Sequence, residues 1–441
     1  MNSTNSRSLL LLSQRFLWKA VATVLLTVAP FFALPTHSSE QASPETVGMS
    51  SERLESMATF VNRHIEAGHI SGGVTLVARH GKLIHLQAHG QRGADDARPM
   101  TTDALFRIFS MTKPITTVAA MMLYEEGYFH LNDPVAKYLP ELANLEIYHQ
   151  GELVPVDQPI TIEHLMTHTA GLTYGWASDH PVELAYQEAA LQTSANLDEF
   201  VATLGKIPLR FPPGERYHYS IATDVLGALI ERLSGETLEV FLSSRLFQPL
   251  GMNDTFFNVP NDKLDRVVPN HGWNPETKTL GSLPANYQLP LQGVTLFSGG
   301  GGLISSAEDY LIFCEMLRQG GSYGGVRFLG PKTVEFMTMD HLTADVRNKG
   351  ATEYPAQHLY PGQSFGLGFG VITNPAQTGV ISSMGAYSWG GAANTKFWID
   401  PEEDLIAIFM TQVMNAPFGD QLRFDMKVAT YQAITELGSQ R

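Results

Sequence analysis

The feature that most constrains the fold of this 441-residue chain is that its strand-forming segments lie near its two ends. The runs GGVTLVAR and KLIHLQAHG, joined by His80 and Gly81, predict a β-hairpin, and TKFWIDPEEDLIAIFMTQ predicts a second one with DPEED as its turn. An amphipathic helix behind a serine cap is predicted over 51–68, and a last helix over 424–437. Between them, from about 110 to 294, the pattern indicates helices and long loops rich in Pro and Gly.

These segments predict an α/β (α+β) fold in which both ends of the chain build one antiparallel sheet. We expect residues 39–109 and 295–441 to form this sheet domain with its flanking helices. Residues 110–294 are then expected to form an inserted, mostly helical domain. The cleft between two such domains is the expected place for a binding site.

The first 38 residues are expected to be a secretory signal peptide. They contain Arg7, Arg15 and Lys19 without an acidic residue, followed by an apolar run from Ala20 to Leu34, which is the order found in export signals. This run is shorter than the about 20 apolar residues of a spanning helix, so we expect cleavage and no stable membrane span. The expected localisation is periplasmic or secreted.

The composition narrows the class of partner. A formal net charge of −15 argues against nucleic acid as a partner, and a hydrophobic content of 44% is typical of a well-packed globular protein.

The single cysteine, Cys314, lies in a helical-looking segment and is expected to be a buried structural thiol. The sequence has no HExxH or clustered Cys/His pattern, so neither a metal nor another cofactor is expected. The oligomeric state is not indicated.

One short motif suggests nucleophilic chemistry. The stretch LFRIFSMTKPITTVAAMML places Ser110 three residues before Lys113 at the expected start of a helix. Residues i and i+3 lie about 5 to 6 Å apart on one helix face, so the ammonium can reach the hydroxyl. The free N–H groups of the helix start can bind an oxyanion. A lysine that ordinarily titrates near 10.4 is a poor base, so burial and a partner are required.

The segment PPGERYHYSIATDVLGALI offers this partner in Tyr219, which precedes a helix. A tyrosine beside the lysine can share one proton with it. A third segment, SMGAYSWGGAANTKFWIDP, places Trp389, Gly390 and Gly391 at the mouth of the C-terminal hairpin. Paired glycines allow a backbone to come close to a ligand. Each motif alone arises often by chance, and their combination is what carries the hypothesis.

Together these segments resemble the serine β-lactamase and penicillin-binding protein superfamily, in particular its class C β-lactamase-like family VIII carboxylesterases. The resemblance covers about residues 51–412. It rests on SMTKPIT, LNDPVAKYLPEL, TIEHLMTHTAGL, FPPGERYHYS, PLGMNDT, GGGGLISSAEDY, GLGFG and WGGAANTKFWIDP. It implies that Ser110 is the nucleophile, that Lys113 activates it, and that Tyr219 is the general base that later returns the proton.

The resemblance also assigns roles around the nucleophile. Trp389, Gly390 and Gly391 correspond to the K-T-G motif of the family, and the N–H groups of Ser110 and Ala392 would form the oxyanion hole.

Two departures from the family pattern concern the substrate. Ile221 stands where lactamases have an asparagine that binds the substrate amide, and Trp389 stands where they have a lysine that receives the carboxylate. These residues suit an uncharged ester. Trp389 and Tyr174, the latter in GLTYGW, are expected to pack against its acyl or alcohol part.

We therefore expect an exported serine hydrolase that cleaves short-chain carboxylic esters through an acyl-enzyme. A β-lactamase or D-alanyl-D-alanine peptidase remains an alternative. A non-catalytic binding protein on the same fold is an alternative from another class.

Other candidate motifs are weaker. Ser388 in AYSWG is one residue from a G-x-S-x-G pattern, but it lies between a loop and a hairpin. His168 is expected to be structural, and His218 is expected to point away from Tyr219. The glycine run 299–302 lacks the strand and helix context of a dinucleotide-binding loop.

Overall fold

The computed structural model describes residues 41–177, 179–283, 288–350, 353 and 359–438. The expected signal peptide lies outside these residues and stays a prediction. Among the described residues, no helix has the length and apolar character that crossing a bilayer requires.

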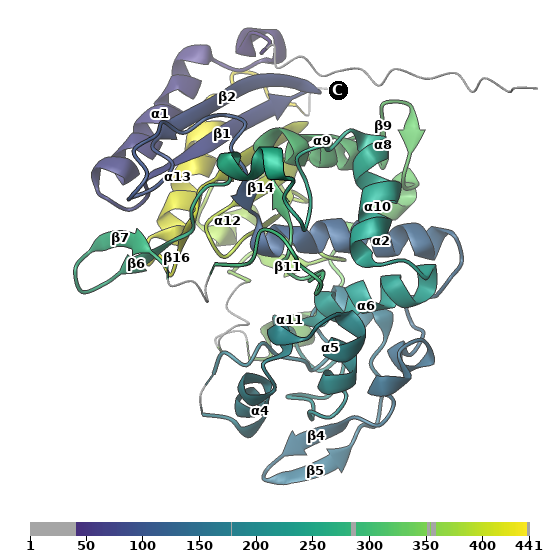
Figure 1. The fold of residues 1–441 in the computed structure, drawn as a ribbon. Helices are drawn as coiled ribbons and strands as arrows, with labels where there is room; N and C mark the ends of the chain where they lie inside the picture. Colours follow the sequence, from purple (N-terminus) through teal and green to yellow (C-terminus); the bar gives the residue numbers. More distant parts are fainter. Residues whose placement is uncertain (1–40, 178, 284–287, 351–352, 354–358, 439–441) are drawn as a thin grey trace, which may run out of the picture. The chain divides into compact units, whose positions relative to one another are not determined.

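A seven-stranded antiparallel sheet with the order β11-β12-β13-β14-β15-β1-β2 forms the centre of the fold (Figure 1). The two ends of the chain meet inside it, because β1 pairs with β15 and places Val74 opposite Met410. This confirms the predicted fold class and both predicted hairpins. The strands are β1 (Gly72–Arg79), β2 (Lys82–Gly90), β11 (Gln363–Phe365), β12 (Gly370–Ile372), β13 (Tyr387–Gly390), β14 (Lys396–Asp400) and β15 (Leu405–Met410).

Helices cover both faces of this sheet, and β15 shows why its sequence is apolar at every position. Leu405, Ala407 and Phe409 pack in one hydrophobic cluster with α1 (Ser51–Glu66) and α13 (Gly419–Tyr431). The alternate residues of β15 pack in the other cluster, with α2 (Thr112–Glu125) and α9 (Ala307–Arg318). Because successive side chains of a strand point to opposite faces, a strand that is covered twice has no polar position.

The remaining elements surround this centre. The other helices are α3 (Ile162–Met166), α4 (Pro181–Ala189), α5 (Leu197–Leu204), α6 (Ala222–Ser234), α7 (Leu238–Leu242), α8 (Gln248–Leu250), α10 (Pro331–Met337), α11 (Ala344–Asn348) and α12 (Pro375–Thr378). The short paired strands are β3 (Phe106–Arg107) with β8 (Ile304–Ser305), β4 (Glu146–His149) with β5 (Glu152–Pro155), β9 (Ser322–Tyr323) with β10 (Val326–Arg327), and β6 (His271–Asn274) with β7 (Thr279–Ser282) and β16 (Val413–Met414).

The C-terminal helix differs from its predicted bounds. It begins at Gly419, before the predicted 424, and ends at Tyr431 instead of 437. It ends early because the following residues bind the N-terminal segment, where the N–H of Thr435 donates to the carbonyl oxygen of Gly48 at 2.9 Å. The predicted domain boundary at 294 stays a prediction. The strand β6, which precedes this boundary, pairs with β16, which follows it.

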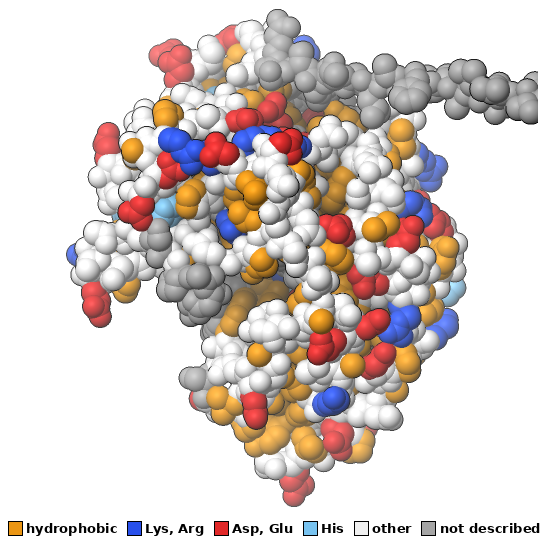
Figure 2. Space-filling model, viewed as in Figure 1, with side chains coloured by type: hydrophobic (Ala, Val, Ile, Leu, Met, Phe, Trp, Pro, Cys, Tyr) orange, Lys and Arg blue, Asp and Glu red, His pale blue; other side chains and the backbone are white. Residues whose placement is uncertain are grey.

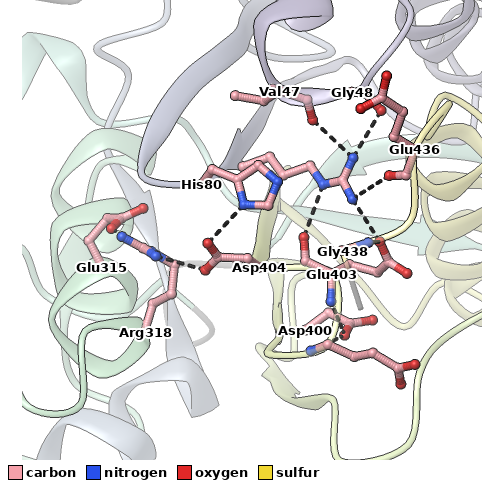
Figure 3. A network of polar contacts seen from close by, with 12 residues as sticks. Val47, Gly48, His80, Glu315, Arg318, Asp400, Glu403, Asp404, Glu436 and Gly438 are labelled. Carbon is pink, nitrogen blue, oxygen red and sulfur yellow. Dashed lines mark hydrogen bonds and ion pairs between the residues drawn. The ribbon is translucent and has the colours of Figure 1, made fainter. Parts of the chain in front are cut away.

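The buried side chain of Arg79 forms hydrogen bonds with segments near both ends of the chain (Figure 3). Arg79, at the end of β1, is only 1% exposed. Its guanidinium donates to the carbonyl oxygens of Val47, Gly48, Glu403 and Glu436 at 2.8 to 3.0 Å, and to the Glu403 carboxylate at 2.8 Å. These five hydrogen bonds use all five N–H donors of the side chain.

A second set of contacts beside Arg79 joins α9 to the turn between β14 and β15. Asp404 in this turn accepts from Arg318 at 2.7 Å and lies 2.9 Å from Nδ1 of His80 (Figure 3). Arg318 also donates to Glu315 at 2.8 Å within α9. These polar contacts therefore connect the turn between β14 and β15 both to His80, which follows β1, and to α9.

Candidate active site

Ser110 lies in a sharp turn that leads directly into α2. The turn is a single 3-10 segment, Phe109–Met111, and α2 begins at the next residue. Phe109 has a φ of 43°, a left-handed conformation that is uncommon for a residue with a bulky side chain. The end of β13 comes close to this turn, because a Cβ on Gly391 would lie 2.4 Å from the carbonyl oxygen of Ile108. Only glycine permits this approach.

Lys113 is buried beneath Ser110, with 1% of its surface exposed. Its Nζ donates to Oγ of Ser110 at 3.2 Å, to the hydroxyl of Tyr174 at 2.8 Å and to the carbonyl oxygen of Gly300 at 2.6 Å. These three hydrogen bonds use all the N–H donors of an ammonium. Two of the three acceptors are hydroxyls and none is a carboxylate, so the partners of this cation can themselves donate a proton.

Tyr219 lies beside this cluster, as the sequence predicts. Its ring centroid is 4.7 Å from Nζ of Lys113, and its hydroxyl accepts a hydrogen bond from Nε1 of Trp389 at 3.2 Å. The side chain is only 3% exposed. The loop before α6 therefore brings Tyr219 to Lys113, while β13 brings Trp389 to Tyr219.

Tyr174 has a more direct contact with Lys113 than its predicted role in packing the substrate implies. Burial, with Tyr219 and Asp224 as neighbours, raises the pKa of Tyr174 well above its usual value. This tyrosine therefore keeps its proton at neutral pH and is a hydrogen-bond partner of the lysine. Its ring stacks on Trp176 with centroids 4.3 Å apart, and Trp176 is 46% exposed.

A cavity of about 720 Å³ opens in front of these groups. In Figure 2 the visible face is hollowed near β11, and hydrophobic side chains are seen inside the hollow. Ile221 is not among the residues that line the cavity, and it is buried in the hydrophobic core at the start of α6. The predicted site residues that line the cavity are Ser110, Tyr219, Trp389, Gly390, Gly391 and Ala392.

The floor of the site comes from residues that the sequence analysis missed. The carbonyl of Gly300 binds Lys113, while its N–H donates to Oδ1 of Asp224 at 3.1 Å. Ser298 donates to the same carboxylate at 2.5 Å. A Cβ on Gly300 would lie 2.4 Å from Oδ2 of Asp224, so the position requires glycine. The signals in the sequence were the glycine run itself and an aspartate five residues after Tyr219.

The weaker candidates have other surroundings, although Ser388 lines the same cavity and His168 lies beside Tyr219. Ser388 lies within β13 opposite Trp398, and not in a strand-to-helix turn. Nε2 of His218 lies 3.3 Å from Thr173, and burial lowers the pKa of His218 to about 3, so this ring stays neutral. His168 packs against the ring of Tyr219 with centroids 4.6 Å apart.

Neither the thiol of Cys314 nor a metal site offers another reactive centre in the part of the chain that the structure describes. Cys314 is fully buried, and burial raises the pKa of its thiol well above the usual value, which suits a structural residue. In the part of the chain that the structure describes, no group of three or more His, Cys, Asp or Glu side chains is arranged to hold a metal ion.

Comparisons with known proteins give the family of the chain. A family model described as Beta-lactamase matches residues 57–430. Esterase EstB of Burkholderia gladioli is 31% identical over 378 residues, which cover 82% of this chain and 90% of that protein. Protein Rv1367c of Mycobacterium tuberculosis is 36% identical over 369 residues, which cover 81% of this chain and 90% of that protein. The solved structure of EstCE1, described as a hydrolase with promiscuous acyltransferase activity, aligns with a TM-score of 0.73 and 27% identity over 86% of this chain and 99% of that one.

Proposed function

The chain belongs to the beta-lactamase family, whose serine hydrolases include esterases, and from this premise we propose that it hydrolyses short-chain carboxylic esters through an acyl-enzyme on Ser110. The observation that carries the proposal is the buried ammonium of Lys113, which is hydrogen-bonded to the hydroxyls of Ser110 and Tyr174. Tyr219 beside it supplies the group that accepts the proton.

Acylation follows from this arrangement. Oγ of Ser110 attacks the carbonyl carbon of the ester while its proton passes to the deprotonated oxygen of Tyr219, and the ammonium of Lys113 stabilises the negative charge that this oxygen carries before the transfer. The oxyanion accepts hydrogen bonds from the N–H groups of Ser110 and Ala392, each worth about 3 kcal/mol in the transition state. The C–O bond to the alcohol then breaks, and the alcohol leaves with the proton of Tyr219.

Deacylation repeats these steps with water. Tyr219 takes a proton from a water molecule that attacks the acyl carbon, and the bond to Oγ of Ser110 breaks as the proton returns to that oxygen. Tyr174 keeps its proton throughout and holds the ammonium in place.

The preference for esters rests on two side chains. Trp389 occupies the position at which the family resemblance places a lysine for the substrate carboxylate, and its indole is bound to Tyr219. Ile221 occupies the position of an amide-binding asparagine and lies in the core. An amide and a carboxylate next to the reacting carbonyl would therefore lack partners, which is costly in a buried site.

The test is a parallel measurement of kcat/KM for p-nitrophenyl acetate, butyrate and palmitate, nitrocefin, and a D-alanyl-D-alanine peptide. We expect p-nitrophenyl butyrate to exceed nitrocefin and the peptide by about 10³-fold, with palmitate a poor substrate. Ser110→Ala is the control for background hydrolysis. Nitrocefin or peptide turnover equal to that of butyrate would favour the lactamase or peptidase alternative. No turnover of any substrate would favour a binding protein.

A further inference from the structure

The cavity that contains Ser110 has a second end with three cationic side chains. Lys396 belongs to β14, and Arg423 and Lys427 belong to α13. Residues four apart on a helix share one face, so Arg423 and Lys427 point to the same side of α13. We call these three residues the cationic end of the cavity.

Lys396 connects the cationic end to the reaction centre. It pairs with Gly390 between β14 and β13, and a Cβ on Gly390 would lie 2.5 Å from Nζ of Lys396. Because alternate residues of a strand face opposite sides, Lys396 lies on the face of β13 opposite to the side chain of Trp389. The cationic end therefore lies beside the strand that borders Ser110, at a place different from that of Trp389.

The charges of the cationic end are poorly compensated. Arg423 pairs with Asp420, whose carboxylate is 79% exposed, but its buried Nε has no hydrogen-bond partner in the described structure. Among the described residues, neither the ammonium of Lys396 nor that of Lys427 forms an ion pair or a hydrogen bond. Lys427 is only 3% exposed, and its Nζ lies 5.9 Å from the ring centroid of Trp398. Lys396 is half-buried and Lys427 is buried, and a cation that is partly withdrawn from water gains from an anionic partner.

The titration of the two lysines agrees with this geometry. Burial, with the charge of Arg423 nearby, lowers the pKa of Lys396 to about 7 and that of Lys427 to about 8. Asp400 also faces Lys427, but its carboxylate accepts a hydrogen bond from the hydroxyl of Tyr431 at 2.6 Å. Asp420 also lines the cavity and acts to raise the pKa of Lys396, but it is the ion-pair partner of Arg423, so an anion in the cavity would provide a partner for the two lysines.

We propose that the cationic end binds a carboxylate carried by the ester substrate, so that esters with an anionic end are preferred over neutral esters of the same length. The inference rests on the proposed hydrolysis of esters at Ser110 and adds the substrate class. A carboxylate can accept charge-assisted hydrogen bonds from Lys396, Arg423 and Lys427, whereas a neutral ester leaves them unpaired. The carboxylate can lie on the acyl or on the alcohol side of the ester.

Two matched substrate pairs distinguish these sources. For the acyl side, kcat/KM for mono-p-nitrophenyl adipate is compared with that for its methyl ester. For the alcohol side, 4-(butyryloxy)phenylacetate is compared with its methyl ester, in which the leaving phenol is electronically similar. We expect the ratio of charged to neutral substrate to be at least about 10-fold in one pair, the effect of one charged hydrogen bond.

The variants Lys396→Met and Lys427→Met keep an unbranched side chain of nearly the same length and remove its charge. Each is expected to lower the ratio at least about 5-fold, since a charge-assisted hydrogen bond is lost. Lys332→Met is the control, because Lys332 lies on α10 with 83% of its side chain exposed, and the ratio should not change.

Two results would overturn the proposal. One is a ratio near 1 in both substrate pairs for the unmodified protein, and the other is a ratio that neither lysine variant changes. Turnover of p-nitrophenyl butyrate distinguishes a failure of the anion-site proposal from a failure of the proposed ester hydrolysis. If butyrate is cleaved and the ratio is near 1, only the anion site is rejected, whereas absent butyrate turnover rejects ester hydrolysis and the anion site with it.

Discussion

Two buried cations, Arg79 and Lys113, have opposite surroundings. The guanidinium of Arg79 directs its five N–H groups at four carbonyl oxygens and one carboxylate (Figure 3). The ammonium of Lys113 directs its three N–H groups at two hydroxyls and one carbonyl. Arginine keeps its proton and fixes what surrounds it, whereas lysine is a compact charge that can stabilise a group that gains and loses a proton. Burial alone therefore does not identify the catalytic cation, and its partners do.

The largest expected effect is on catalysis at the Lys113 site. Lys113→Met should lower kcat for p-nitrophenyl butyrate by at least about 10³-fold, or about 4 kcal/mol, because Tyr219 loses the cation that stabilises its deprotonated oxygen. Tyr219→Phe should have a similar effect, and the double variant should be little worse, since the residues act as one unit. Thermal unfolding of each variant checks that the fold is retained. If kcat of Lys113→Met stayed within 10-fold of that of the unmodified protein, Lys113 would have no larger role in catalysis than Arg79.

The second effect should appear in stability and not in catalysis. Arg79→Met leaves the Glu403 carboxylate and several carbonyls without their donor, so we expect the free energy of unfolding to fall by about 3 kcal/mol. Urea unfolding measures this loss, and kcat/KM of the folded variant should be unchanged. Arg98→Met is a matched control with an exposed ion pair to Asp265, for which the loss should be much smaller. A loss of activity in folded Arg79→Met would contradict the separation of roles.

A smaller effect distinguishes the two tyrosines at the Lys113 site. Tyr174→Phe removes one of the three acceptors of the ammonium, and we expect kcat to fall by about 10-fold, close to the worth of one hydrogen bond. The loss should be well below that of Tyr219→Phe. If the order of the two variants were reversed, Tyr174 would be the base and Tyr219 the positioning residue.

The smallest effect concerns the cationic end of the cavity. Since burial lowers the pKa of Lys396 to about 7 and that of Lys427 to about 8, both are mostly charged at pH 6 and mostly neutral at pH 9. The other charged groups that face them are Arg423, Asp420 and Asp400. The preference for a carboxylate-bearing ester should therefore fall several-fold as the pH rises from 6 to 9. A preference that is constant or rises would contradict binding by these lysines.

Local patterns in the sequence predict the strands and hairpins of the central sheet and the contact between Ser110 and Lys113. The apolar runs of β1 and β15 and the turn residues of the hairpins depend on neighbours in the chain, and the i, i+3 spacing of Ser110 and Lys113 gives their contact directly. The bounds of α13 were less predictable, because its end depends on pairing with Gly48, far away in the sequence.

The parts of the site that come from distant loops were not predictable from local patterns. Gly300 and Asp224 form the floor beneath Lys113 only because a loop and the first turn of α6, 76 residues apart, meet there. The hydroxyl of Tyr174 reaches the same lysine across 61 residues. Lys396 begins a strand, where a charged residue is ordinarily solvent-exposed, and its place over Gly390 depends on strand pairing. Such contacts follow from tertiary packing and not from periodicity.

The central claim is that Ser110 forms the acyl-enzyme, and covalent labelling tests it most directly. The purified protein is treated with a fluorophosphonate probe, its mass is measured, and the modified peptide is mapped, with Ser110→Ala treated in parallel. We predict one added probe per chain, located on Ser110, and no addition to Ser110→Ala. Attachment to Ser388 or to any other residue, or cleavage of p-nitrophenyl butyrate by Ser110→Ala at an undiminished rate, would contradict the account.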